Sequence, residues 1–225
     1  MIPKLIWQTH EAEYDDLELV QKKAINTWKN LNPGWNYLYV SKKARRTYID
    51  EFDQFLINCY SELSGINQAD LFKILVIYKY GGFYADMDSI CCISLDEVVS
   101  HMGDEKEIIC SSPGYQVSDN SINSSNFGAI ANSKNFKKIV EKIIIDYKEI
   151  LNNEKISLKN LNPGRPTWPA FNEINKNNID TVLFDEDYFF HGENLKVRFD
   201  EDYPVHYENK IIPYSEFLKI KNLTI

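Results

Sequence analysis

Residues 67–88 read NQADLFKILVIYKYGGFYADMD, and this stretch says more about the fold than any other. Its first part is apolar nearly all round, which predicts a buried helix over residues 67–80. Gly81 and Gly82 favour the end of that helix, because glycine readily takes the positive φ of a C-cap. An aromatic segment, Phe83 to Asp86, then predicts a short strand. The stretch therefore predicts a helix, a sharp stop and a strand.

Two carboxylates close the stretch, Asp86 and Asp88. Residues i and i+2 of a strand point to the same side, so both side chains are expected to project together from the strand end. Paired carboxylate oxygens suit a hexacoordinate Mg²⁺ or Mn²⁺ ion. Such an ion can hold a diphosphate and stabilise it as it leaves. An Asp-x-Asp triplet alone more often marks a solvated turn, so the hypothesis depends on the whole ordered combination.

Asp70 and Lys73 lie at positions i and i+3 of the predicted helix and share one face. One interpretation is a surface ion pair of little energetic consequence. The other turns this face towards the carboxylates of Asp86 and Asp88. Asp70 would then accept hydrogen bonds from ligand hydroxyls, and Lys73 would lie near phosphate. We favour the second interpretation, above all for Asp70.

The composition is that of an ordinary globular protein. The chain has 225 residues, 44% hydrophobic and 26% charged, which is enough for one domain with a sizeable core. A net charge of −8 argues against a nucleic-acid polymer or an anionic membrane as partner. No segment approaches the ~20 apolar residues of a transmembrane helix, and residues 1–4 lead directly into a strand without a signal peptide. We therefore expect a cytoplasmic protein.

The cysteines carry no metal-binding or disulfide pattern. None of the four forms a Cys-x-x-Cys pair, and two are adjacent. This usage predicts buried free thiols rather than a zinc site. The four are Cys59, Cys91, Cys92 and Cys110.

Periodicity and capping signals predict alternating strands and helices. Strands are expected at residues 2–7, 37–40, 83–86, 107–111, 126–131 and within 181–190. Helices are expected at residues 15–31, 44–61, 67–80, 135–151 and 167–175, with a short one opening at 94–97 and a mobile loop at 112–125. This order predicts a single α/β domain over residues 1–225, a sandwich whose central sheet is mixed but mainly parallel and flanked by helices.

Three ordered motifs resemble a known family. The chain begins IPKLIWQTH at residues 2–10, continues NPGWNYLYV at residues 32–40, and reaches the acidic stretch at residues 69–88. In this order they resemble the family 32 glycosyltransferases, the Asp-x-Asp sugar-binding-region family that includes capsular-polysaccharide and initiating mannosyltransferases. The glucosylating domains of large clostridial toxins are similar more distantly.

The resemblance implies a GT-A nucleotide-sugar-binding fold and a metal-dependent hexosyltransferase, as in polysaccharide biosynthesis. Its donor would be a UDP- or GDP-sugar, its acceptor a glycan or other hydroxyl compound, and its cofactor Mn²⁺ or Mg²⁺, with retention of configuration. The implied catalytic residues are Asp70, Asp86 and Asp88. The implied donor-binding residues are Trp7, Gln8, Asp70, Lys73, Tyr84 and Asp86. The implied metal ligands are Asp86, Asp88 and His206.

Two of these assignments have plain alternatives. Trp7, placed where relatives stack the donor base, is nearly as well explained as a core residue. His206 lies in a Tyr-rich tail and is equally well explained as a solvated side chain. Relatives use a late His or Asn near the metal, which favours the role of metal ligand.

Departures from the family pattern keep other functions open. Lys73 stands where the family usually has Arg, Ala69 replaces Ser, and no Trp follows the block His206-Tyr207-Glu208. These changes leave room for a non-catalytic or degenerate nucleotide-sugar-binding module. A glycoside hydrolase is less favoured, because its two carboxylates stand ~5–9.5 Å apart across the scissile bond. Asp86 and Asp88 are expected instead to chelate from one side.

Overall fold

The computed structural model describes residues 1–100, 102–103, 106–111, 123–153, 156–175, 181–184, 189–191, 204–207, 210–213, 216 and 219. Its centre is a six-stranded sheet with the strand order β2-β1-β3-β6-β5-β7. These strands are β1 (Leu5–His10), β2 (Asn36–Ser41), β3 (Gly82–Ala85), β5 (Ile108–Ser111), β6 (Asn123–Ala129) and β7 (Thr181–Phe184). Only β6 runs antiparallel to its neighbours in this sheet. The predicted mixed, mainly parallel sheet is confirmed.

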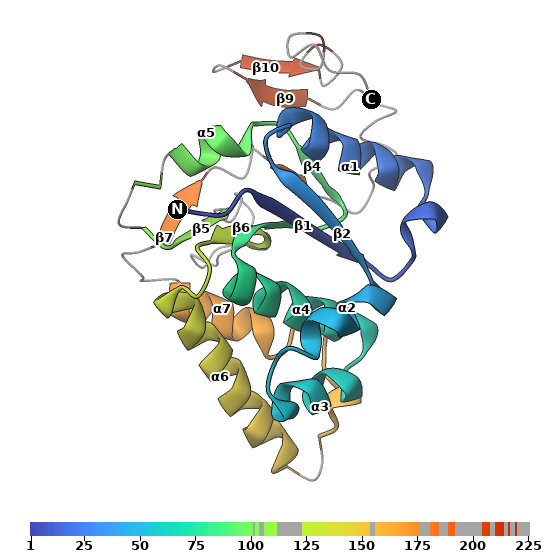
Figure 1. The fold of residues 1–225 in the computed structure, drawn as a ribbon, viewed down its shortest axis with the longest axis vertical. Coiled ribbons are helices and arrows are strands. Elements are labelled where there is room, and N and C mark those ends of the chain that lie inside the picture. Colours follow the sequence, from blue (N-terminus) through green and yellow to red (C-terminus); the bar gives the residue numbers. More distant parts are fainter. Residues whose placement is uncertain are drawn as a thin grey trace.

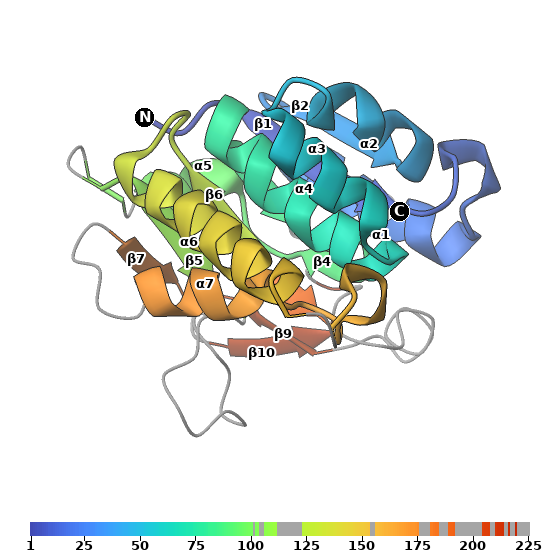
Figure 2. The ribbon, with the colours of Figure 1, turned by 90° about the horizontal axis from the view of Figure 1, so that it is seen from below.

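Helices cover both faces of the sheet (Figures 1 and 2). One face carries α1 (Leu19–Leu31) and α5 (Leu95–Ser100). The other carries α2 (Lys42–Ile49), α3 (Gln54–Glu62), α4 (Gly65–Tyr80), α6 (Lys134–Leu151) and α7 (Thr167–Asn175). Alternate strand residues supply the two cores. Trp7 and Tyr84 face α4, while Ile6 and Phe83 face α1.

Smaller elements complete the described chain. They are the 3-10 turns η1 (Tyr14–Asp16) and η2 (Leu158–Asn160), the antiparallel pair β4 (Ser89–Cys91) and β8 (Phe189–His191), and the antiparallel pair β9 (Pro204–Tyr207) and β10 (Lys210–Pro213). In Figure 1 the pair β9–β10 lies at the top, beyond α1.

Helix α4 lies in the middle of its layer, packed against α2, α3, α6 and α7 (Figure 2). Its buried residues therefore occur all round the helix, as the apolar stretch predicts. Gly81 ends it with a φ of 68°, and Gly82 follows with a φ of 102°. A Cβ on Gly81 would lie 2.7 Å from the backbone nitrogen of Ala131, and one on Gly82 would lie 2.7 Å from the carbonyl oxygen of Leu5. Both positions need glycine for conformation and for space.

Several predicted boundaries are wrong for local reasons. The helix expected over residues 44–61 is two helices, because the side chain of Asp53 accepts a hydrogen bond from Leu56 N and starts α3. α1 begins at Leu19, where Glu18 and Gln21 form a capping box. β6 begins at Asn123, inside the predicted loop, whose residues 112–122 lie outside the described part of the chain.

Two other predictions concern side chains and membrane spans. All four cysteines are buried and free, as expected. Within the residues described above, no helix is both long and apolar enough to cross a membrane.

Candidate active site

Asp86 and Asp88 lie in the turn that joins β3 to β4. β3 ends at Ala85, and Ser89 N donates a hydrogen bond to Asp86 O at 3.1 Å, which closes the turn. The predicted strand is present but ends at Ala85, one residue before Asp86, so strand alternation does not set the direction of the two carboxylates. Met87 points inward and is buried, whereas Asp86 and Asp88 are partly exposed. The turn thus keeps both carboxylates accessible by a different geometry.

Lys73 joins the motif helix to this turn. Its Nζ lies 2.9 Å from Asp70 Oδ1 and 3.7 Å from Asp86 Oδ1. The side chains of Lys73 and Asp70 are only 3% and 7% exposed, against 26% for Asp86. A surface ion pair is therefore excluded. The α4 face that carries Asp70 and Lys73 is turned towards the end of β3, as favoured from the sequence.

The cluster gathers the carboxylates of three residues around Lys73. Burial alone would lower the pKa of Lys73, but the carboxylates of Asp86, Asp70 and Asp88 outweigh it and raise the pKa. Lys73 is therefore a charged ammonium with three carboxylates near it. Carboxylates gathered in this way favour a divalent cation bound beside them. The donor set, carboxylate oxygens at a partly exposed turn, fits Mn²⁺ or Mg²⁺.

Two buried side chains hold Asp86 in place. Tyr84 Oη donates a hydrogen bond to Asp86 Oδ1 at 2.9 Å. Burial, and then the Asp86 carboxylate, hold the pKa of Tyr84 well above its ordinary range, so the hydroxyl stays protonated. Gln8 Nε2 donates to Asp86 O at 3.0 Å, and Gln8 Oε1 accepts from Tyr37 Oη at 2.7 Å. Tyr84 and Gln8 therefore position the turn that carries Asp86 and Asp88.

Trp7 packs in the core beside the glycine pair. It is buried, and its Nε1 donates a hydrogen bond to Gly81 O at 2.9 Å. Its ring contacts Tyr48 edge-on and Tyr80 at a tilt, with centroid distances of 5.5 and 5.7 Å. Stacking on a donor base stays a prediction, and it would require this ring to become accessible.

His206 lies in β9, paired with Ile211 of β10. Its side chain belongs to the part of the chain that is not described, so its role as a metal ligand stays a prediction.

Trp168, at the start of α7, is a neighbour of the site that the sequence did not identify. Its Nε1 lies 3.4 Å from Asp70 Oδ1, and its ring is half-exposed. The available signal was a tryptophan directly after a Pro/Gly-rich turn. That pattern does not reveal that the turn packs on α4.

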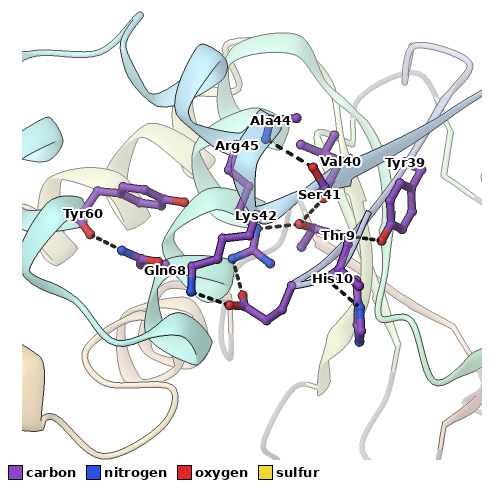
Figure 3. A network of polar contacts seen from close by, with 12 residues as sticks. Thr9, His10, Tyr39, Val40, Ser41, Lys42, Ala44, Arg45, Tyr60 and Gln68 are labelled. Atoms are coloured by element: carbon purple, nitrogen blue, oxygen red, sulfur yellow. Dashed lines mark hydrogen bonds and ion pairs between the residues drawn. The ribbon is translucent and has the colours of Figure 1, made fainter. Parts of the chain in front are cut away.

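A second polar cluster lies at the carboxyl ends of β1 and β2 (Figure 3). Arg45 Nε donates to Thr9 Oγ1 at 2.7 Å, and Arg45 also pairs with Glu11 Oε1 at 2.8 Å. Lys42 Nζ pairs with Glu11 Oε2 at 2.7 Å. Arg45 is buried, whereas the Glu11 side chain is 47% exposed. The sequence KKARR did not show which basic residue turns inward.

Glu11 connects this second cluster to the motif helix. A Cβ on Gly65 would lie 2.9 Å from Glu11 Oε2, so the carboxylate lies against the first turn of α4. Negative charge is favoured at the amino end of a helix. The cluster of Glu11, Arg45 and Lys42 therefore ties α4 to the ends of β1 and β2.

Known glycosyltransferases resemble this chain in sequence and in fold. Residues 19–107 match the family described as glycosyltransferase sugar-binding region containing DXD motif. Inositol phosphoceramide mannosyltransferase 3 of Schizosaccharomyces pombe is 31% identical over 103 residues, which cover 44% of this chain and 28% of that protein. The initiation-specific alpha-1,6-mannosyltransferase of Candida albicans is 29% identical over 105 residues, covering 44% and 27%. The matches thus span little more than a quarter of each relative.

The solved PaToxG glycosyltransferase shares the fold. It superposes with a TM-score of 0.50 at 16% identity, covering 77% of this chain and 68% of that chain. At this identity the likeness concerns the fold alone, which is the GT-A type expected from the sequence. Residues 19–107 are thus similar to the sugar-binding region of the DXD glycosyltransferases, and the fold of the chain is the one that the PaToxG glycosyltransferase has.

Proposed function

We propose that this protein, as one domain over residues 1–225, is a metal-dependent glycosyltransferase. It would move a hexose from a nucleotide-diphospho-sugar to a glycan or other hydroxyl acceptor, with retention of configuration. The observation that carries the proposal is the cluster at the end of β3, which gathers the carboxylates of Asp70, Asp86 and Asp88 around Lys73.

Asp86 and Asp88 would hold Mn²⁺ or Mg²⁺. When bound, the ion supplies positive charge to the diphosphate that leaves with the nucleotide. Within the described residues no group of three His, Cys, Asp or Glu side chains is arranged to hold a metal. Diphosphate oxygens and water would therefore complete the shell, together with His206 as our proposed third protein ligand.

The chain's own residues supply the rest of the donor site. Lys73 would place its positive charge near the leaving phosphate, as a point charge where the family usually has the planar fork of Arg. Asp70 Oδ2 is buried and has no hydrogen-bond partner within the described part of the chain. Buried polar atoms are normally paired, so this oxygen is suited to accept a hydrogen bond from a sugar hydroxyl. Gln8 and Tyr84 would keep Asp86 in position throughout.

The proposal also covers the identity of the sugar donor, the biosynthetic role and the cellular location. The relatives are named as mannosyltransferases, so GDP-mannose is the first donor to test, beside UDP-glucose and UDP-galactose. A role in polysaccharide biosynthesis and a cytoplasmic location stay predictions.

The second candidate is a non-catalytic nucleotide-sugar-binding module. Lys73 in place of the usual Arg favours it, because a flexible ammonium holds a phosphate less rigidly than a guanidinium does. Such a module would bind the donor with Mn²⁺ but would neither hydrolyse nor transfer its sugar.

Donor binding and turnover with Mn²⁺ test the proposal. A thermal-shift screen of the three nucleotide-sugars identifies the donor, since a ligand that binds only the folded state raises Tm. Asp88→Asn is expected to lower metal-dependent turnover at least about 100-fold. This is the usual loss when one group that stabilises the charge developing in the transition state is removed. Glu141→Gln is the matched control, because Glu141 is exposed on α6 and pairs with Lys137. If EDTA and Asp88→Asn both leave turnover unchanged, the proposal is wrong.

A further inference from the structure

Trp168 is exposed beside a buried carboxylate. It is 47% exposed, whereas Trp7, Trp28 and Trp35 are at most 7% exposed. Folding usually buries most of such a large ring, and the indole N–H then finds a partner. Here the N–H meets Asp70 Oδ1 at 3.4 Å while much of the ring stays open to solvent. The indole N–H of Trp168 is therefore fixed by Asp70, while part of its apolar ring is accessible to a ligand.

The ring is held firmly by the turn before α7. A Cβ on Gly164 would lie 2.5 Å from Cδ2 and 2.8 Å from Cε2 of Trp168, so Gly164 lies directly against the indole. Gly164 also has a φ of 77°, which favours glycine. Trp168 N donates to Gly164 O at 2.8 Å. The indole is thus packed on the backbone of this turn, and about half of the residue stays exposed.

Helix α4 fixes this turn relative to the charged cluster. Asn67 Oδ1 accepts a hydrogen bond from Gly164 N at 2.9 Å, and Asn67 Nδ2 donates to Leu161 O at 3.1 Å. Asn67 is buried and lies three residues before Asp70, so both point from the same side of α4. One rigid helix therefore positions the indole and the carboxylate together, which is the preorganisation a binding site needs.

The two groups match the two kinds of surface on a pyranose. A sugar ring has a C–H face that packs on an aromatic ring and hydroxyls at its edge that need hydrogen-bond partners. Trp168 offers the apolar surface, and Asp70 Oδ2 is the buried acceptor without a partner among the described residues. The Lys73 ammonium contacts both Asp70 and Asp86, so the Asp70 carboxylate lies close to the turn that we propose as the metal site. A hexose attached to a diphosphate at that turn would reach it.

We infer that Trp168 and Asp70 form the subsite for the hexose of the donor. The exposed indole surface packs against the C–H face of the sugar, and Asp70 Oδ2 accepts a hydrogen bond from one of its hydroxyls. The inference rests on the function proposed above and adds to it a specificity-determining residue that no sequence motif indicated. The nucleoside diphosphate itself makes no contact with Trp168.

The test separates the sugar from the nucleotide. Dissociation constants are measured by calorimetry in Mn²⁺ for UDP and UDP-glucose, and for GDP and GDP-mannose. Trp168→Ala is expected to weaken binding of the preferred nucleotide-hexose about tenfold, the size of one aromatic contact, and to leave its nucleoside diphosphate within about twofold. Trp168→Phe keeps most of the affinity. Ile145→Ala, which removes an exposed apolar side chain from α6, behaves as wild type.

Fluorescence gives a readout that needs no variant. The other tryptophans are buried, so acrylamide quenching of the wild-type protein reports mainly on Trp168. The nucleotide-hexose should protect the fluorescence more than the nucleoside diphosphate does.

Three results would overturn the inference. Trp168→Ala could weaken nucleoside diphosphate and nucleotide-hexose equally, which would mean that the ring only supports the fold of the site. It could also leave both affinities unchanged, with equal quenching in both complexes. Finally, wild-type protein that binds neither ligand with Mn²⁺ removes the proposed function and this subsite together, and it does so before any variant is compared.

Discussion

The cluster around Glu11 and the cluster around Lys73 both lie at the ends of parallel strands, but they differ in which charge predominates among their members. Around Glu11, two cations, Arg45 and Lys42, neutralise one half-exposed carboxylate. Around Lys73, three carboxylates surround one buried ammonium, and Asp70 Oδ2 lacks a partner among the described residues. The first cluster pairs one carboxylate with two cations, whereas the second gathers three carboxylates around one lysine and leaves Asp70 Oδ2 as a buried acceptor. The balance of charge, rather than the presence of an ion pair, separates the cluster that supports the fold from the candidate site.

Lys73→Met should give the largest effect on stability. The change leaves Asp70 buried without its ammonium, and losing one partner of a buried ion pair typically costs about 3–5 kcal/mol. Mn²⁺ should recover part of this loss, because under the proposed function the ion would bind Asp86 and Asp88 in the folded state only and would add positive charge there. Urea unfolding without Mn²⁺ measures the loss of stability, and urea unfolding with Mn²⁺ measures how much of it the ion recovers. An equal loss at all Mn²⁺ concentrations would contradict the proposal that a divalent cation binds at this cluster.

Arg45→Met should cost less and should not respond to metal. The carboxylate of Glu11 is half-exposed and keeps Lys42, so we expect a loss of about 2 kcal/mol, mainly from the hydrogen bonds of the buried guanidinium to Thr9 and Glu11. The same urea titrations should show no greater Mn²⁺ response than wild type. Recovery by Mn²⁺ equal to that of Lys73→Met would remove the distinction between the two clusters.

The candidate site was partly visible in the sequence because most of it is local. The apolar run, the glycine pair and the aromatic strand each follow from neighbouring residues, and α4 and β3 lie where these signals predict them. The turn at Asp86 was missed, because alternating residues cannot reveal that Ser89 N bonds back to Asp86 O.

The residues that were missed depend on contacts distant in sequence. Arg45 turns inward to meet Thr9, which is 36 residues away. Trp168 reaches Asp70 because Asn67 holds Gly164, 97 residues further along the chain. No periodicity or cap encodes such contacts, so one sequence alone could not assign these two side chains.

The smallest expected effect is a pH dependence at the Glu11 cluster. Burial alone would raise the pKa of Glu11, but hydrogen bonds and charges from Lys42 and Arg45 outweigh it, so the pKa is lowered. A carboxyl with a lower pKa in the folded state adds stability above its ordinary pKa of about 4.3, and this is lost as the pH falls through the folded value. Because Glu11 is half-exposed, screening should hold the contribution below about 1 kcal/mol.

Glu11→Gln should therefore be less stable than wild type near neutral pH, and the difference should shrink as the pH falls below about 4. Added salt should also reduce it, since the cluster is open to solvent on the side of Glu11. Glu141→Gln on α6 serves as the control for losing one exposed carboxylate from a lysine pair. A difference that grows on acidification would mean that burial, and not the two cations, dominates at Glu11. The cluster would then lack the surplus positive charge that sets it apart from the one around Lys73.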